Sequence, residues 1–231
     1  MKKTEKQLKR YKKHRTLSLY WLFYDHCRWL FAPFAALIFR TKKVYVDKKA
    51  TVAQIKKGAM IVSNHISFYD ALVLQYAFWY RRVHSMMLDT AFQTKIGSLF
   101  FRGVNCFPIN PSNLNSSFAS MRQCVARLQY GYVVAMFPEG HINFSTQPEI
   151  KEFQSGSVFM ALQAKSVIIP CFLYRQKGKF HRFHLYIGKP FNPQDYFSGA
   201  INVESMQLVT QQLRNIELKM QNEYLEKVGK K

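Results

Sequence analysis

The sequence AMIVSNHISFYD, residues 59–70, organises the rest of the chain. Its first four residues are apolar and predict a buried strand, and the segment from Ala71 to Tyr80 has the spacing of a helix. His65 therefore stands where a strand ends, and Asp70 stands in the first turn of the following helix. This geometry can place the Asp70 carboxylate on one imidazole nitrogen, which fixes the tautomer and leaves the other nitrogen as a base.

A structural role explains part of the same pattern. Ser67 and Asp70 have the spacing of a capping box, with Ser67 as the N-cap residue and Asp70 at the third helical position. Such a box only satisfies backbone N–H groups at the start of a helix. The two interpretations are compatible, because Ser67 can cap the helix while the Asp70 carboxylate turns towards His65.

The composition excludes a disordered chain and indicates a polyanionic partner. Of 231 residues, 48% are apolar, which is enough for a sizeable core. There are 34 Lys and Arg against 13 Asp and Glu, a formal net charge of +21, together with 20 Phe, 13 Tyr and 3 Trp. This mixture suits an anionic membrane surface or single-stranded nucleic acid, and composition alone does not separate the two.

The four cysteines predict buried free thiols, with no disulfide and no metal site. They are widely scattered, none forms a C-x-x-C motif, and most lie in apolar runs: Cys27, Cys106, Cys124 and Cys171. This usage favours a reducing, cytoplasmic compartment. The long basic N-terminal region has no small-residue cleavage site after an apolar core, so we expect no cleavable signal peptide.

Residues 1–40 predict a membrane-associating segment. Residues 1–15 hold eight basic residues and one acid, and the stretch from Leu17 to Phe39 is rich in aromatic residues and leucine. That stretch has the length of a membrane span but contains Asp25 and Arg28, and charges in hydrocarbon cost about 2.5–3.5 kcal/mol each on insertion.

Two short interfacial helices, Leu17 to Cys27 and Trp29 to Phe39, explain the segment better than a full span. We expect a peripheral or monotopic protein on the cytoplasmic face of the cell membrane. The alternative is a pair of helices that simply covers the core.

Residues 41–231 alternate between strand and helix patterns, as one domain. Strand patterns occur at Val44 to Val46, Ala59 to Val62, Val83 to Leu88, Cys106 to Ile109, Tyr132 to Phe137, Val167 to Tyr174 and Arg182 to Ile187. Helix patterns occur at Ala71 to Tyr80, Phe92 to Phe101, Leu114 to Leu128 (capped by Ser112 or Asn113), Gly156 to Lys165, and from about Asn202 onward. The alternation predicts an α/β fold with a mixed, largely parallel sheet flanked by helices, and with its last strand antiparallel near an edge.

Open α/β sheets gather their ligands at the carboxyl ends of the strands. Three stretches fall at such ends: Asn64 to Asp70, the residues from Asn110 onward, and Pro138 to His141. The third offers the carboxylate of Glu139 beside a glycine whose backbone can approach a ligand closely.

Three blocks, in this order, resemble the glycerolipid (lysophosphatidic acid) acyltransferase family. They are Asn64-His65 with Asp70, Phe137-Pro138-Glu139-Gly140, and Ile168-Ile169-Pro170. The stretch from Gly103 to Ile109 occupies the place of a further family block. The resemblance covers about residues 44–190.

The resemblance implies transfer of a fatty acyl group from a coenzyme A or acyl carrier protein thioester to a lipid hydroxyl. The implied acceptor is a lysophospholipid such as 1-acylglycerol-3-phosphate. His65 would take the proton from the acceptor hydroxyl while Asp70 holds the imidazole, with no acyl-enzyme intermediate and no resident cofactor.

The acceptor site implied by the resemblance centres on Glu139, which would bind acceptor hydroxyls. Backbone N–H groups near the turn of Glu139 and Gly140 would stabilise the oxyanion. Asn64, His141 and Asn110 are further candidate substrate-binding residues. The structural alternative for Glu139 is a surface carboxylate that ends a strand.

Two family arginines that hold the acceptor phosphate are missing. The corresponding positions are Asn110-Pro111 and His141-Ile142-Asn143, and neither Asn nor His replaces the bidentate bonds of an arginine. Either another cation binds phosphate, for which Lys95, Arg102 and Arg175 are candidates, or the acceptor is a glycolipid or another lysolipid.

The alternatives of other classes are a basic nucleic-acid-binding module and an inactive, lipid-binding member of the family. Nucleic acid binding requires basic and aromatic residues in one groove. Much of the charge is instead local, because residues 1–15 carry +7 from eight basic residues and one acid, beside a membrane-like segment. We therefore expect an anionic membrane surface, an acyl thioester and a lysolipid as partners, and no nucleic acid.

Overall fold

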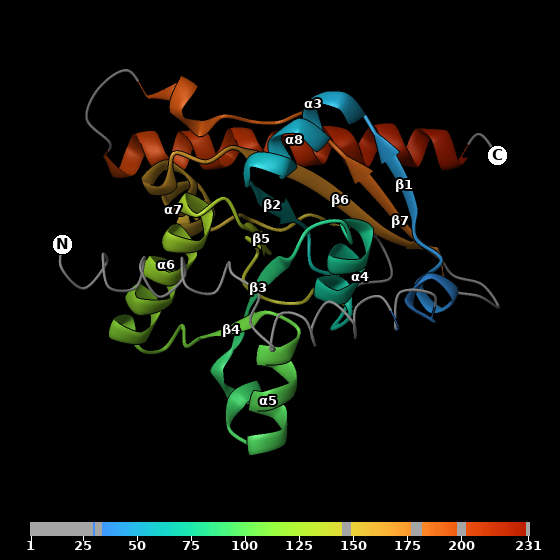
Figure 1. Cartoon of the computed structure of the whole chain (residues 1–231). Helices are drawn as coiled ribbons and strands as arrows, with labels where there is room; N and C mark the ends of the chain where they lie inside the picture. Colours follow the sequence, from blue (N-terminus) through green and yellow to red (C-terminus); the bar gives the residue numbers. More distant parts are fainter. Residues whose placement is uncertain (1–29, 31–33, 145–148, 177–181, 198–201, 230–231) are drawn as a thin grey trace.

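The computed structural model describes residues 30, 34–144, 149–176, 182–197 and 202–229. These residues form a sheet with helices on both faces (Figure 1). The interfacial helix expected from Leu17 to Cys27, and Cys27 itself, lie outside the described residues. Within the described ranges, no helix is both long enough and apolar enough to cross a bilayer.

Seven strands form one sheet in the order β1-β7-β6-β2-β5-β3-β4. Their bounds are β1 Lys42–Tyr45, β2 Met60–Ser63, β3 Val83–Leu88, β4 Cys106–Ile109, β5 Val133–Met136, β6 Ile168–Gln176 and β7 Arg182–Ile187. β6, β2, β5, β3 and β4 run parallel, whereas β7 is antiparallel to β6 and β1 is parallel to β7. The mixed, largely parallel sheet is confirmed, as is the antiparallel strand near its edge.

The helices are α3 Lys48–Lys57, α4 Asp70–Ala77, α5 Lys95–Gly103, α6 Leu114–Gln129, α7 Gly156–Ala164 and α8 Val203–Gly229, with short 3-10 helices η1 Asp89–Phe92 and η2 Pro193–Tyr196. Asn113 caps α6 as predicted, because its side chain accepts the N–H of Ser116. The sequence patterns did not indicate α3, which Asp47 caps. The helix predicted from Phe92 to Phe101 is observed as α5, which starts three residues later because Thr94 caps it by accepting the N–H of Gly97, and η1 precedes it.

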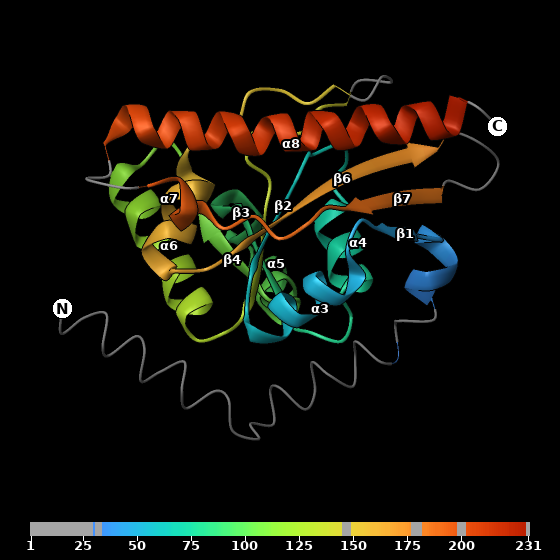
Figure 2. The ribbon, with the colours of Figure 1, turned by 90° about the horizontal axis from the view of Figure 1, so that it is seen from above.

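Alternate residues of β2 face two different cores. Ile61 packs in a cluster with residues of α3 and α4, whereas Met60 and Val62 pack with residues of α6, α7 and α8. Figure 2 shows α8 as one long helix that crosses its face of the sheet, from α7 to β6 and β7. Because both faces of β2 are buried, the strand reads as a continuous apolar run.

The register of the central strands decides which loops meet. Val62 of β2 pairs with Met136 of β5, and Ser63 pairs with Cys171 of β6. Because these neighbouring strands are parallel and in step, the loop that begins at Asn64 and the loop that begins at Phe137 leave the sheet side by side.

Candidate active site

The amide of Asn64 continues the sheet where β2 ends. Its Nδ2 donates to the carbonyl oxygen of Leu173 at 2.9 Å, and its Oδ1 accepts the N–H of Leu173 at 2.7 Å. The buried side chain thus takes the place of a peptide group in the ladder between β2 and β6. This pairing lets the main chain turn away at His65 while the edge of the sheet stays hydrogen-bonded.

The structure brings His65 and Asp70 into contact. Nδ1 of His65 lies 2.8 Å from Oδ2 of Asp70, and the same oxygen accepts the N–H groups of Ile66 at 2.7 Å and Ser67 at 2.8 Å. Asp70 is completely buried, whereas the side chain of His65 is 18% exposed. A carboxylate on Nδ1 favours the tautomer with a proton there, so Nε2 is left as the basic nitrogen.

The predicted capping box is only half formed. Helix α4 begins at Asp70, its N-cap residue is Tyr69, and no side chain caps it. Asp70 does bind the N–H of Ser67, but Oγ of Ser67 accepts the N–H of Tyr69 at 3.0 Å instead of that of Asp70. The expectation that Ser67 is the N-cap residue is therefore wrong. The bonds to Asp70 hold residues 66–69 in a turn before the helix starts.

The loop after β5 closes around His65. The ring of Phe137 stacks on the imidazole, with centroids 4.1 Å apart and planes 14° apart. The N–H of His65 donates to Oε1 of Glu139 at 3.0 Å, and its carbonyl accepts the N–H of Asn143 at 2.7 Å. Two of the three sequence blocks that carry the family resemblance, the one with His65 and the one with Glu139, thus touch each other directly.

Glu139 is buried, with an exposed fraction of 2%, so its description as a surface carboxylate is wrong. Its second oxygen, Oε2, accepts the N–H of Lys151 at 3.3 Å. Burial raises the pKa of the Glu139 carboxyl, while these two backbone hydrogen bonds and the nearby His141 and His65 act in the opposite direction. Glu139 therefore joins the His65 loop to the segment that contains Lys151.

Gly140 occupies a position that only glycine accepts easily. Its φ is +74°, and a Cβ there would lie 2.6 Å from Nε2 of Gln154. Its N–H donates to the carbonyl of Phe137 at 3.2 Å. The N–H of Gly140 thus closes a turn, and stabilisation of the oxyanion by backbone N–H groups near this turn stays a prediction.

Asn110 is held away from this cluster. It follows β4, which lies three strands from β2 in the sheet. At about 4.8 Å per strand, the lateral separation is roughly 14 Å. Nδ2 of Asn110 donates to Oδ2 of Asp89 at 2.8 Å, and Oδ1 of Asn110 accepts the N–H of Ser112 at 3.0 Å. The structure therefore gathers Asn64, His65, Asp70, Glu139, Gly140 and His141, but it does not bring Asn110 to them.

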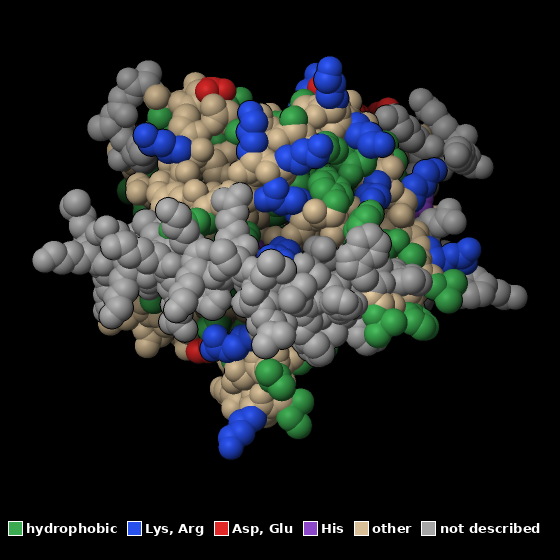
Figure 3. Space-filling model, viewed as in Figure 1, with side chains coloured by type: hydrophobic (Ala, Val, Ile, Leu, Met, Phe, Trp, Pro, Cys, Tyr) green, Lys and Arg blue, Asp and Glu red, His purple; other side chains and the backbone are tan. Residues whose placement is uncertain are grey.

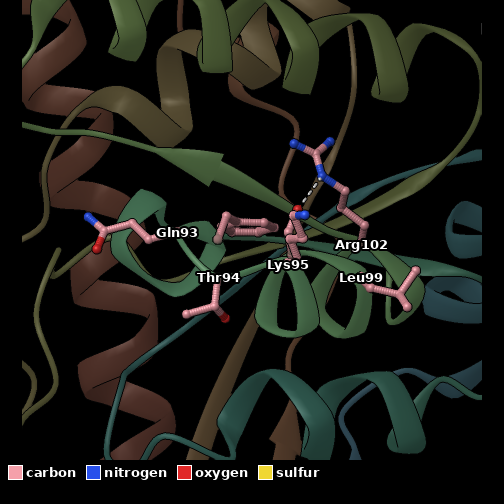
Figure 4. Close-up of a pocket in the computed structure, with 7 residues that line it drawn as sticks. Gln93, Thr94, Lys95, Leu99 and Arg102 are labelled. Carbon is pink, nitrogen blue, oxygen red and sulfur yellow. Dashed lines mark hydrogen bonds between the residues drawn. The ribbon is translucent and has the colours of Figure 1, made fainter.

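The contacts found for two of the cations proposed from the sequence, Arg102 and Arg175, are with other groups, and a different arginine reaches the segment that binds Glu139. Lys95 and Arg102 line a separate pocket of about 530 Å³ at α5 (Figure 4). The guanidinium of Arg175 lies 5.8 Å from the centre of the Phe183 ring. Arg214 of α8 donates to the carbonyl of Lys151 at 2.8 Å and thus contacts the segment bound to Glu139.

Glu217 of α8 is a buried acid that the sequence prediction missed. It is completely buried, and burial together with the neighbouring Glu139 raises its pKa well above the ordinary value. The sequence did contain a sign of this burial. Glu217 follows Leu213 by four residues and precedes Met220 by three, so it lies on the face of α8 that packs on the sheet. It lies beneath the site, near enough to Asn64 and Glu139 to interact with both.

The side chains of the site suit general-base chemistry without a thiol nucleophile. Cys106, Cys124 and Cys171 are buried and free, as predicted for them. Burial raises the pKa of both Cys106 and Cys124 to about 12, so neither is a thiolate at neutral pH. In the part of the chain that the structure describes, no three His, Cys, Asp or Glu side chains gather as metal ligands.

A known protein is similar to this chain in sequence, and a solved structure is similar to it in fold. A probable 1-acyl-sn-glycerol-3-phosphate acyltransferase of Mycoplasma pneumoniae is 30% identical over 130 residues, which are 53% of this chain and 47% of the relative. The chain thus spans about half the length of that protein. The crystal structure of PlsC, the 1-acyl-sn-glycerophosphate (LPA) acyltransferase of Thermotoga maritima, superposes with a TM-score of 0.60 at 16% identity, over 86% of this chain and 78% of that one.

The family model described as Acyltransferase matches residues 43–174, which run from within β1 to within β6 and include both loops around His65. A match over more than half of the chain identifies the fold and the general chemistry together. The protein therefore belongs to the acyltransferase family.

Proposed function

We propose that the protein moves a fatty acyl group from a coenzyme A or acyl carrier protein thioester to a lipid hydroxyl, with His65 as general base. The observation that carries this proposal is the 2.8 Å contact between Nδ1 of His65 and the buried carboxylate of Asp70. It orients the imidazole, favours the tautomer with its proton on Nδ1 and its lone pair on Nε2, and stabilises the imidazolium that forms when Nε2 takes a proton.

In the proposed reaction, Nε2 of His65 removes the proton of the acceptor hydroxyl while the oxygen attacks the thioester carbonyl. The tetrahedral intermediate expels the thiolate as the ester forms, and the imidazolium returns its proton to that thiolate. Each bond and proton is accounted for without an acyl-enzyme intermediate. Neither a cofactor nor a cysteine is required.

We place the acceptor beside Glu139 and His141, and favour a lysophospholipid such as 1-acylglycerol-3-phosphate. The names of the two relatives support this acceptor. Asn64 contributes by holding the end of β2, since both polar atoms of its amide bind Leu173. An acceptor without phosphate, such as a glycolipid, is the alternative, because Asn110-Pro111 and Ile142 stand where the resemblance expects arginines.

We further propose that residues 1–40 bring the domain of residues 41–231 to the cytoplasmic face of an anionic membrane. The basic and aromatic composition of the segment supports this placement. Vesicle binding by the full chain, measured with and without nucleic acid as a competitor, tests it against the nucleic-acid alternative. If nucleic acid displaces the chain from vesicles that carry the same amount of negative charge, that result would favour the nucleic-acid alternative.

The catalytic proposal is tested with the purified full chain, each thioester donor and a panel of monoacyl acceptors with and without phosphate. His65→Ala should lower kcat/KM by roughly 10²–10⁴, the usual contribution of a general base. The variant should unfold at nearly the wild-type temperature, which shows that the fold is intact. A rate within about twofold of the wild type contradicts the assignment of His65 as the base.

A further inference from the structure

Helix α5 turns its apolar face to solvent. Ile96, Leu99 and Phe100 have exposed fractions of 83%, 75% and 56%. The apolar face of an amphipathic helix normally packs against the core, so this orientation is the reverse of the usual one. Three large exposed side chains on one helix mark an interaction surface better than single exposed residues do.

The body of the protein fixes this orientation. On the opposite side of the helix, a Cβ at Gly97 would lie 2.7 Å from the carbonyl oxygen of Ala91, so the backbone packs closely there. Phe101 points the same way, and its ring centre lies 5.8 Å from that of Phe92 in η1. Helix α5 therefore cannot rotate its apolar face inward without losing these contacts.

Helix α5 projects from the molecule, at the end opposite to α8 (Figure 1). Figure 3 shows hydrophobic and basic side chains on this projecting end. The helix follows β3, which runs parallel to β5 and, through it, to β2. The chain thus enters η1 and α5 from the edge of the sheet that carries His65.

Basic side chains border the apolar face. Lys95 and Arg102, both exposed, are spaced four and three residues from Leu99 and lie on its side of the helix (Figure 4). Arg102 donates from Nε to Oγ of Ser98 at 3.1 Å, and its guanidinium carbon lies 5.7 Å from the centre of the Phe92 ring. These two contacts hold the cation at the border of the apolar face. No Asp or Glu occurs between Asp89 and Glu139, so no acid in this stretch offsets the two cations.

We propose that α5 is a membrane-contact element in its own right, separate from residues 1–40. Ile96, Leu99 and Phe100 enter the acyl-chain region of an anionic bilayer, and Lys95 and Arg102 contact lipid phosphates at its surface. An apolar face with a basic border is the pattern of an interfacial helix.

A lipid surface fits this face better than the other possible occupants. Nucleic acid is disfavoured because the two most exposed side chains of the face, Ile96 and Leu99, are aliphatic, and Phe100 alone offers a ring on which a base could stack. A second copy of the chain is disfavoured because symmetric contact would bring Lys95 and Arg102 close to the same cations of the other copy.

A probe at position 99 tests the insertion directly. The full chain carries Cys27→Ser and Leu99→Cys, labelled with an environment-sensitive fluorophore; the other cysteines are buried. With vesicles of phosphatidylcholine and phosphatidylglycerol that have brominated acyl chains, the emission should shift to the blue and be quenched. The matched control is Leu208→Cys, an exposed position on α8, where neither change should occur.

Several outcomes would overturn the proposal. The probe at position 99 could stay in a water-like environment while the chain sediments with vesicles. This result would show that only other segments bind the membrane. A probe shielded before vesicles are added shows that a second copy covers the face. The readout does not depend on turnover, so His65→Ala should leave the insertion unchanged even if the proposed reaction is wrong.

The basic border is tested by Lys95→Gln with Arg102→Gln. One basic residue near an anionic surface contributes about fivefold in affinity, so the pair should weaken binding to anionic vesicles by up to about 30-fold. Binding to phosphatidylcholine alone should not change. The exposed pair Lys189→Gln and Lys219→Gln is the matched control; an equal loss in that control shows that only net charge matters and contradicts a role for α5.

Discussion

The imidazole of His65 lies face to face with the ring of Phe137, with 4.1 Å between centroids and 14° between planes. The stack and the Asp70 carboxylate hold the proposed base from two directions. Phe137→Leu keeps an apolar side chain but removes the stack, which is worth about 0.5–1.5 kcal/mol for an aromatic pair. We expect kcat/KM to fall by about 2- to 12-fold.

Steady-state kinetics of Phe137→Leu and Phe137→Tyr check this prediction. The tyrosine variant retains the ring and serves as the control, with a rate near that of the wild type. A leucine variant as active as the tyrosine variant would show that the stack has no role in orienting His65.

Asp70→Asn separates the orientation of the base from the stability of the loop. An amide oxygen can still accept the N–H groups of Ile66 and Ser67, so the chain should fold. The neutral amide no longer stabilises an imidazolium at His65, so kcat should fall by roughly 10²–10⁴. Kinetics and thermal unfolding measured together check both expectations. Asp195→Asn, at an exposed position, should leave kcat unchanged.

Asn64→Ala should act on stability more than on substrate affinity. The substitution leaves the buried N–H and carbonyl of Leu173 without their partners. Each unsatisfied buried group costs about 1–3 kcal/mol, so the free energy of unfolding should fall by at least that much in urea denaturation. The exposed Asn215→Ala should change it little. A rise in KM at unchanged stability would instead indicate that the amide binds substrate.

Glu217→Gln should remove a pH dependence of stability. Burial and Glu139 raise the pKa of Glu217 in the folded state, so the folded chain holds a proton that the unfolded chain releases above about pH 4.5. Between these two pKa values, stability falls as pH rises, by up to about 1.4 kcal/mol per pH unit.

Urea denaturation from pH 5 to pH 8 checks this sign. The glutamine variant should lose less stability over this range than the wild type, whereas the exposed Glu226→Gln should keep the wild-type slope. Equal slopes in all three proteins would mean that Glu217 is ionised when folded.

The strand and helix order was readable from the sequence because local patterns carry it. β3 and β4 begin and end at the predicted residues, and the helix predicted from Leu114 has its expected cap at Asn113. The misses are also local in origin. The Thr94 cap starts α5 at Lys95, three residues later than predicted, and α4 ends at Ala77, three residues before the predicted end at Tyr80.

The sequence by itself determined the pairing of His65 with Asp70. The two residues are five positions apart, and a strand end followed by a turn over that distance is enough to bring the carboxylate back to the imidazole. Only the tertiary structure decided the roles of residues far apart in the chain. The register of Val62 with Met136 placed Phe137 on His65, and the width of three strands kept Asn110 away. The packing of α8 buried Glu217, and the packing of Gly97 and Phe101 left the apolar face of α5 outside. Such contacts depend on how whole elements dock, and sequence spacing does not encode them.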